Sequence, residues 1–259
     1  MNNQSINYFQ NPQLDGGHFF HQGNQKIGVL LIHGFTATTV EVRILADHFI
    51  QKDYSVSAPL LPGHGTTPED LNSRKLSEWT ECVEIAYNQL RQRCDYVIVG
   101  GESMGAVLTL FLASKHPTIK AIYLFSPALL VKRLKFARFM QLTTPLMDKN
   151  QPEDDLAWQG YTVYPTRAAH QFYQLTRVVK ISLTRVISPA IIFQGKFDHS
   201  IDLNNIDFIH KNIGSTIKEK VWLKNSGHVM LLDRETGLII NKIENFNQQI
   251  QISSHIHGL

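Results

Sequence analysis

The chain has 259 residues, of which 43% are hydrophobic and 18% are charged, a composition that suits one globular domain of generous size or a domain with an insertion. Aromatic residues make up 10% of the chain and are spread along it, which excludes collagen-like sequence, long repeats and gross disorder. Because 25 Lys and Arg stand against 22 Asp and Glu, the formal charge is only +3, too small for the basic field that nucleic-acid binding needs.

Apolar runs that end at turn residues alternate with segments of helical periodicity, which predicts βα units around a mainly parallel sheet. The expected strands are 27–32, 54–58, 96–99, 119–125, 190–194 and 220–223. The expected helices are 40–51, 76–93, 104–115, 203–212 and 234–249. The sequence therefore predicts an α/β fold with a mainly parallel central sheet flanked by helices.

The alternation is interrupted between residues 128 and 186. This stretch shows no clear central strand, and we expect several short helices separated by Pro145, Pro152 and Pro165. The βα pattern then resumes and continues to the last expected helix. We predict that residues 1–127 and 187–259 form one α/β core and that residues 128–186 are an insertion into it.

Two features of the sequence bear on the compartment. Residues 1–10 have neither the basic start nor the apolar run of a secretory signal peptide, and no stretch approaches the ~18 apolar residues of a membrane span. Cys82 and Cys94 fall in or directly after one expected helix, 76–93, where a rise of 1.5 Å per residue separates them by about 18 Å, beyond the ~7 Å limit for a disulfide. We therefore expect two free thiols in a reducing cytoplasm.

One five-residue pattern carries the first chemical prediction. Gly101-Glu102-Ser103-Met104-Gly105 fits G-x-S-x-G, the nucleophile elbow, in which a serine is held in a strained turn between a strand and a helix. The pattern alone recurs by chance, and a serine at this point could simply cap the helix. Here it follows the apolar strand 96–99 and opens an apolar helix, as the elbow requires. We predict that Ser103 is a nucleophile.

A serine nucleophile needs a base, and the chain has 12 histidines, so their positions have to discriminate between them. In hydrolases with this elbow the base follows both the serine and the acid in sequence. His228 lies in a loop directly after the last expected strand, from which it could reach over the C-terminal edge of the sheet. His199 is the main competitor, and its position next to an acid makes it less suitable. We predict that His228 is the base, the alternative being a solvated loop residue.

The third residue has to orient the imidazole and stabilise its cation. Asp198 follows the expected strand 190–194 at the C-terminal edge, where the sites of such sheets collect. Asp202, four residues later, is better suited to capping a surface helix. We predict that Asp198 is the acid.

A tetrahedral oxyanion needs at least two aligned N–H donors. We predict the backbone N–H groups of Met104, the residue after the nucleophile, and of Phe35, in the loop after the first long strand. His64, in the loop 62–65, is interpreted as support for the rim of the site rather than as a catalytic residue. The sequence has no Gly-rich phosphate loop, zinc pattern or paired C-x-x-C, so we expect neither a cofactor nor a metal.

Taken together, five short motifs resemble those of the bacterial carboxylesterase and monoacylglycerol lipase branch of the α/β-hydrolases. The resemblance runs from about residue 27 to residue 248. It implies that Ser103, Asp198 and His228 form a catalytic triad, that Phe35 and Met104 form the oxyanion hole, and that the insertion is a helical cap over an acyl pocket. Ala106 departs from the family, in which a second glycine is usual. The motifs are His33–Thr36, Pro62–Gly65, Gly101–Gly105, Gly195–Asp198 and Ser226–Val229.

We therefore predict a serine carboxylester hydrolase that acts on short- to medium-chain monoacyl esters as small-molecule substrates. A thioesterase, an acyltransferase or a carbon–carbon bond hydrolase would use the same triad, because the pocket rather than the fold decides the substrate. A non-catalytic binding protein of the same fold would usually have lost a triad residue. A dehalogenase would need a carboxylate at position 103, where the chain has serine.

The charges of residues 128–186 are uneven. Nine Lys and Arg stand against four Asp and Glu in this stretch, beside an apolar face rich in Leu, Phe and Met. One interpretation is a cap packed on the core with a solvated basic back. The other is a basic face that contacts an anionic lipid surface or a phosphate-bearing substrate.

Overall fold

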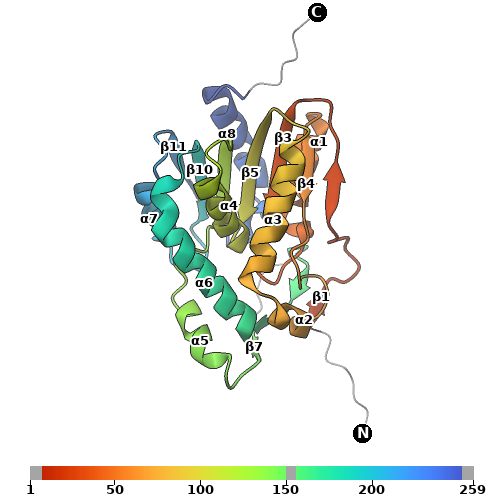
Figure 1. Cartoon of the computed structure of the whole chain (residues 1–259), viewed down its shortest axis with the longest axis vertical. Helices are drawn as coiled ribbons and strands as arrows, with labels where there is room; N and C mark the ends of the chain where they lie inside the picture. The colour runs from red at the N-terminus through yellow and green to blue at the C-terminus, as the bar shows by residue number, and fades with distance from the viewer. Residues whose placement is uncertain (1–7, 150–155, 253–259) are drawn as a thin grey trace, which may run out of the picture.

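The computed structural model describes residues 8–149 and 156–252 of the chain. In this part of the chain the centre is a seven-stranded sheet (Figure 1), and only the edge strand β2 runs antiparallel to its neighbour. The fold is thus the predicted α/β fold with a mainly parallel central sheet. In spatial order the strands are β11 (Lys218–Leu223), β10 (Ala190–Gly195), β6 (Ala121–Phe125), β5 (Tyr96–Glu102), β3 (Ile27–Ile32), β4 (Ser55–Ala58) and β2 (Phe19–His21).

Helices cover both faces of the sheet, because the side chains of each buried strand alternate between the two faces. In β3, Leu30 and Ile32 belong to the apolar core shared with α3, α4 and α7, whereas Val29 and Leu31 belong to the core shared with α1 and α8. Figure 1 shows α3 and α4 in front of the sheet. The helices are α1 (Arg43–Gln51), α3 (Leu76–Arg91), α4 (Met104–Lys115), α7 (Asn205–Asn212) and α8 (Thr236–Gln249).

The predicted elements of the βα pattern all form. The helix predicted at 104–115 has the same bounds as α4, and the stretch 40–51 divides into a 3₁₀ turn, η1 (Thr39–Val42), followed by α1. The sequence reading missed β1 (Phe9–Gln10), β2 and the helix α2 (Pro68–Ser73). These elements have only two, three and six residues, too few to show a hydrophobic period.

Between β6 and β10 the chain leaves the central sheet. As expected, no strand in the described part of this stretch belongs to that sheet, but the expectation of several short helices misses one long helix. This segment 128–186, of which residues 150–155 with Pro152 lie outside the described residues, contains a helix of 17 residues and an antiparallel pair, β7–β9. Pro165 directly precedes the long helix rather than breaking one, because proline is tolerated at a helix N-terminus. The elements are η2 (Leu134–Phe136), α5 (Ala137–Met140), β7 (Leu146–Asp148), β8 (Gly160–Tyr161), β9 (Val163–Pro165), α6 (Thr166–Ser182) and η3 (Leu183–Arg185).

Segment 128–186 lies against the loops at the C-terminal edge of the sheet. The Tyr161 N–H donates to the carbonyl oxygen of Thr36 at 2.8 Å, and the Tyr161 hydroxyl donates to the carbonyl oxygen of Gly63 at 2.8 Å. Helix α6 packs on α4 and α2, and Figure 1 shows it crossing below α4. The loops after β3 and β4 are therefore both tied to this segment.

Within the described residues no helix is long and apolar enough to cross a membrane. Cys82 and Cys94 are free thiols, as predicted. Burial raises the pKa of both thiols, that of Cys82 to about 11, so neither is an activated nucleophile.

Candidate active site

Ser103 lies at the sharp turn between β5 and α4, with a backbone φ of 57° in the left-handed region. A residue with a side chain is strained there, as the nucleophile elbow requires. The turn closes because its neighbours are small. A Cβ on Gly101 would lie 2.3 Å from the carbonyl carbon of Gly105, and a Cβ on Gly105 would lie 2.0 Å from the carbonyl oxygen of Ile32. Ala106, the departure from the family pattern, is buried in the apolar core.

His228 lies in the loop between β11 and the 3₁₀ turn η4 (Met230–Leu232). Its Nε2 is 2.9 Å from the Oγ of Ser103, and its Nδ1 is 2.7 Å from the Oδ2 of Asp198. With a proton on Nδ1, the ring donates to Asp198 and accepts from the Ser103 hydroxyl. Burial lowers the pKa of His228, but the charge and hydrogen bond of Asp198, together with the charge of Glu41, outweigh burial and raise the pKa above 6.5.

Asp198 follows β10 and has a buried carboxyl group. Its Oδ1 accepts from the backbone N–H of Ser200 at 2.9 Å, and its Oδ2 accepts from the Gln194 amide at 2.9 Å as well as from His228. Burial raises the pKa of this carboxyl group, but the charge of His228 and these hydrogen bonds lower it below its usual value. Asp198 is therefore ionised at neutral pH and can stabilise an imidazolium.

The two competitors that the sequence offered lie outside this hydrogen-bonded chain. The carboxylate of Asp202 accepts from the backbone N–H of Asn204 at 3.0 Å and is 3.4 Å from the ammonium of Lys132. His199 is exposed. The structure thus brings Ser103 together with His228 and Asp198, and leaves Asp202 in a capping contact ahead of α7.

The two predicted oxyanion donors belong to the immediate surroundings of Ser103. Met104 is the first residue of α4, so its N–H has no acceptor within its own helix. Phe35 lies in the turn after β3, next to Gly34, on which a Cβ would be only 3.3 Å from the Cβ of Ser103. Met104 therefore adjoins the nucleophile in sequence, and Phe35 follows a glycine whose position leaves little room for a side chain beside the nucleophile.

The ring of Phe35 faces two aromatic residues of segment 128–186. Its centroid is 6.4 Å from that of Tyr164, with nearly parallel planes, and 5.6 Å from that of Phe172. Trp79 and His64 contact the same ring from the core, with centroids 6.3 and 6.2 Å away. Apolar and aromatic side chains therefore surround the turn that precedes the site.

His33 and His64 are buried histidines that hold the loops together. The Nε2 of His33 accepts from the backbone N–H of Leu61 at 3.0 Å, and the Nδ1 of His64 is 3.2 Å from the carbonyl oxygen of the same residue. Burial is the main cause that lowers the pKa of both rings, that of His33 to about 4. Both are neutral at pH 7, and His64 supports its own loop in the way that the sequence predicted.

Two buried acids near Ser103 were missed by the sequence reading. Glu102 is fully buried, and its Oε1 accepts from the backbone N–H of Leu231 at 3.2 Å. Burial, with the charge of Glu41, raises the pKa of Glu102 well above its usual value, which favours the neutral form of this carboxyl. Glu102 had a signal in the sequence, since it stands between an apolar strand and an apolar helix. Glu41 had none, because it reads as an ordinary polar position at the start of an amphipathic helix.

Lys149 was also missed, since a lysine in segment 128–186 reads as a solvated surface residue. Its ammonium contacts the hydroxyl of Thr36 and lies 4.5 Å from the ring centroid of Trp158 and 4.9 Å from that of Tyr164. Burial lowers the pKa of this amine to about 7. The loop after β3 thus meets a buried amine as well as aromatic rings from segment 128–186.

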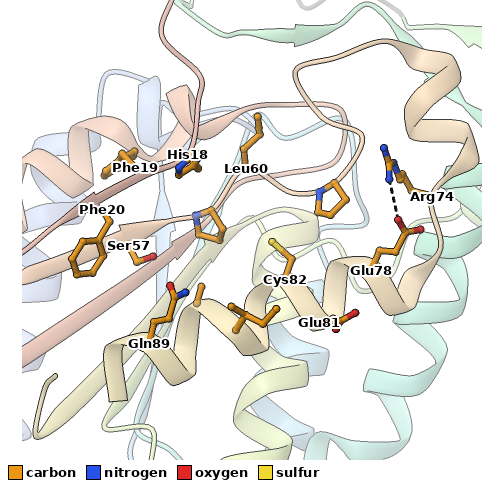
Figure 2. A pocket seen from close by; sticks show the side chains of 14 residues that line it. His18, Phe19, Phe20, Ser57, Leu60, Arg74, Glu78, Glu81, Cys82 and Gln89 are labelled. Atoms are coloured by element: carbon orange, nitrogen blue, oxygen red, sulfur yellow. Dashed lines mark hydrogen bonds and ion pairs between the residues drawn. The ribbon is translucent and has the colours of Figure 1, made fainter. Parts of the chain in front are cut away.

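A cavity of about 570 Å³ opens elsewhere, between β2, the loop after β4 and α3. Figure 2 shows the Arg74–Glu78 ion pair at one end of it and Phe20 with Gln89 at the other. Ser103, Asp198 and His228 are not among its lining residues, so it is separate from the hydrogen-bonded chain. Within residues 8–149 and 156–252, no cluster of three or more His, Cys, Asp or Glu is arranged to hold a metal ion.

Comparisons with known proteins identify a family and relatives for this chain. The family model "Serine aminopeptidase, S33" matches residues 23–159, more than half of the chain. A thermostable monoacylglycerol lipase of Bacillus sp. (strain H-257) is 36% identical over 241 residues, covering 90% of this chain and 95% of the relative. A carboxylesterase of Bacillus subtilis is 26% identical over the same length, with 90% and 96% covered.

Solved structures are similar to this chain as well. One solved structure belongs to the pair of metagenome-derived lipolytic enzymes LipS and LipT. It superimposes on this chain with a TM-score of 0.86 at 32% identity, covering 90% of this chain and 98% of the other. A soluble variant of the monoglyceride lipase of Saccharomyces cerevisiae shares the fold, with a TM-score of 0.75 at 18% identity and 93% and 94% covered. The chain therefore belongs to the α/β-hydrolases, in their carboxylesterase and monoacylglycerol lipase-like branch, and is a serine hydrolase.

Proposed function

We propose that this enzyme hydrolyses short- to medium-chain monoacyl esters through a catalytic triad of Ser103, His228 and Asp198. The observation that carries the proposal is the continuous hydrogen-bonded chain, 2.9 Å from Ser103 Oγ to His228 Nε2 and 2.7 Å from His228 Nδ1 to Asp198. Its serine lies on a strained elbow, and its acid is buried and ionised. A base within hydrogen-bond reach, itself oriented by an ionised acid, is what makes a serine hydroxyl a nucleophile at neutral pH.

In the acylation step, Ser103 Oγ attacks the ester carbonyl carbon while His228 takes the hydroxyl proton. The oxyanion that forms is stabilised by the backbone N–H groups of Phe35 and Met104, and the imidazolium is stabilised by Asp198. His228 then protonates the leaving alcohol as the C–O bond breaks. In the second step His228 takes a proton from water, whose oxygen attacks the acyl carbon. The bond from that carbon to Ser103 Oγ then breaks, and His228 returns the proton to Oγ as the carboxylic acid leaves. Every proton is carried by the chain's own residues, so the mechanism calls for no metal or organic cofactor.

Segment 128–186 acts in this proposal as a cap inserted into the core of residues 1–127 and 187–259, and it helps to form the acyl pocket. The support is that two of its aromatic side chains, Tyr164 and Phe172, face Phe35. An apolar wall of this kind stabilises an acyl chain by removing its methylene groups from water. We expect such a cap to admit a single acyl chain, which favours monoacyl esters.

We also propose that the cap makes a weak contact with an anionic lipid surface, and its exposed side chains support this proposal. Phe136, Phe139 and Leu142 are 51%, 65% and 79% exposed, and the cations of Lys135 and Arg138 lie over the first two rings. Exposed aromatic side chains beside basic ones are typical of segments that enter the headgroup region of a membrane. A weak contact of this kind would bring the site to esters dissolved in a lipid surface.

We further place the enzyme in the cytoplasm. The support is its two free cysteines, each buried enough that its pKa is raised. A reducing compartment leaves such thiols unpaired.

Matched oxygen esters, thioesters and monoacylglycerols of equal acyl length, assayed with the wild type and with Ser103→Ala, test the proposed function. The expected result is turnover of the oxygen esters that exceeds turnover of the thioesters and disappears in Ser103→Ala. Faster turnover of the thioesters would show that the enzyme is a thioesterase that uses the same triad. Ester turnover that survives Ser103→Ala would refute the proposed triad.

A further inference from the structure

Glu41 is a buried acid that lies outside the proposed triad, with only 4% of its surface exposed. Its two carboxyl oxygens accept hydrogen bonds from two distant parts of the chain. Oε2 accepts from the backbone N–H of Gly34 at 2.7 Å, and Oε1 accepts from the indole N–H of Trp158 at 2.8 Å. Burying a carboxyl group is costly unless both of its oxygens find donors, and here each has one.

The first of these hydrogen bonds acts on the loop that carries the proposed oxyanion donor. A Cβ on Gly34 would lie 3.0 Å from the Oε2 of Glu41 and 3.3 Å from the Cβ of Ser103, so Gly34 is packed between the acid and the nucleophile. Phe35 follows directly in the chain. The position of the Glu41 carboxyl therefore limits where the Phe35 N–H can lie relative to Ser103 Oγ.

The second hydrogen bond acts on segment 128–186. The side-chain nitrogen of Lys149 lies over the indole ring of Trp158, 4.5 Å from the ring centroid. The next residue, Gln159, is fixed by a 2.8 Å hydrogen bond with the Thr38 hydroxyl, and Gly160 packs against the carbonyl oxygen of Thr36. The indole N–H is therefore presented to Glu41 by a well-anchored stretch of chain.

We propose that Glu41 is a positioning residue that couples the cap to the oxyanion hole, because one carboxyl group joins Trp158 of segment 128–186 to Gly34 of the loop after β3. This inference rests on the proposed function. Donors to an oxyanion act only when they are fixed before the reaction, and displacement by about 1 Å can cost on the order of 100-fold in rate. Loss of the Glu41 contacts should therefore weaken binding of the transition state more than binding of the substrate.

Three variants test this coupling. Glu41→Gln keeps the shape but offers one acceptor oxygen to two N–H donors. Trp158→Phe keeps an aromatic ring and removes one donor. Glu244→Gln is the matched control, because Glu244 also accepts from two donors, His48 and Lys52, both at 2.8 Å, and joins α8 to α1.

For each variant we would measure kcat and KM per active site titrated with a fluorophosphonate, and the affinity for a trifluoromethyl ketone, whose hemiketal oxyanion occupies the hole. Glu41→Gln should lower kcat about 100-fold and Trp158→Phe about tenfold, each with KM changed less than threefold. The inhibition constant should rise by the same factors as kcat falls. Glu244→Gln should leave all three values unchanged.

Combining Glu41→Gln with Trp158→Phe should cost no more than Glu41→Gln alone, since both substitutions act through one carboxyl group. The inference would be overturned if kcat per titrated site stayed within threefold of wild type in both single variants, or if KM rose while kcat held. These outcomes are separate from failure of the proposed function, because that failure appears in the wild type as ester turnover that does not depend on Ser103.

Discussion

Two parts of the molecule meet at Ser103, and they differ in how completely their apolar side chains are buried. The first is the C-terminal edge of the sheet, where β5 and β10 are paired on both sides and their apolar side chains from Val97 to Val99 and from Ala190 to Phe193 are fully buried. The second is segment 128–186, in which Phe139 is 65% and Leu142 is 79% exposed. Catalysis needs fixed geometry, and all three proposed triad residues come from the first part. The second part contributes aromatic walls and a basic, exposed surface, which suit selection of the substrate.

The largest expected effect lies in the first part. Ser103→Ala should lower kcat for ester hydrolysis by about 10⁴- to 10⁶-fold, because loss of the nucleophile leaves only binding and the oxyanion hole. The fold should be unchanged, since only one hydroxyl group is removed. Steady-state kinetics together with thermal unfolding would show this, and turnover above a tenth of the wild-type value would refute the nucleophile.

The next effect distinguishes two acids four residues apart. Asp198→Asn should lower kcat by about 10⁴-fold, because an amide neither stabilises the imidazolium nor holds the required tautomer. Asp202→Asn should leave kcat near the wild-type value, since this residue contacts Asn204 and Lys132 rather than His228. Parallel kinetics of the two variants provide the check, and the reverse ranking would contradict the triad geometry.

The second part of the molecule, segment 128–186, should determine which acyl chain lengths the enzyme prefers. Each additional methylene group of the acyl chain should raise kcat/KM by up to about fourfold, from ~0.8 kcal/mol per buried CH₂, until the pocket is full. Longer chains should then be turned over more slowly, and triacylglycerols poorly, because three chains do not fit under the cap. A series of nitrophenyl esters and glycerides measures this. Equal rates on short esters and long triacylglycerols would show that segment 128–186 forms no closed pocket.

The pH dependence of kcat/KM tests the first part of the molecule, the C-terminal edge of the sheet. His228 acts as a base only when neutral, and its pKa is raised above 6.5, mainly because the charge of Asp198 outweighs the effect of burial. As pH falls through this raised pKa, kcat/KM should fall tenfold per pH unit. The profile should therefore have its acidic midpoint above pH 6.5. A midpoint below pH 6.5 would mean that Asp198 does not act on the free enzyme's imidazole as inferred.

The smallest effect concerns the exposed surface of the cap. Phe139→Ser should weaken binding to vesicles that contain anionic lipid by several-fold, because about 2 kcal/mol of apolar burial is lost at most, and salt should weaken wild-type binding. Turnover of a water-soluble ester should be unchanged. Vesicle co-sedimentation measures the binding, and the absence of wild-type binding, or its insensitivity to salt, would refute the lipid contact alone.

The two parts also differ in how far they could be predicted from the sequence. The strands around Ser103 are fully buried apolar runs that end in glycine-rich turns, so hydrophobic pattern and motif spacing located β5, β10 and the three residues of the hydrogen-bonded chain. The choice of Asp198 over Asp202 followed from the same logic, because one directly follows a strand and the other precedes a helix. Patterns of this kind are local, and the sheet turns them into a three-dimensional site.

The rest could not be predicted, for a physical reason. Strands β7, β8 and β9 have two or three residues each and are held by partners far away in the sequence, such as Phe9 for Tyr161. Glu41 and Trp158 are 117 residues apart, and only the folded chain shows that they share a hydrogen bond. Periodicity carries no information on such contacts.

Reaction of the wild type and of His228→Asn with a serine-directed phosphonate, followed by peptide mass spectrometry, tests the central claim most directly. The account predicts one adduct, on Ser103, that forms rapidly in the wild type and at least about 100-fold more slowly in His228→Asn, because the hydroxyl then has no base. An adduct on a different residue, or labelling of Ser103 at the same rate in both proteins, would contradict a nucleophile activated by His228.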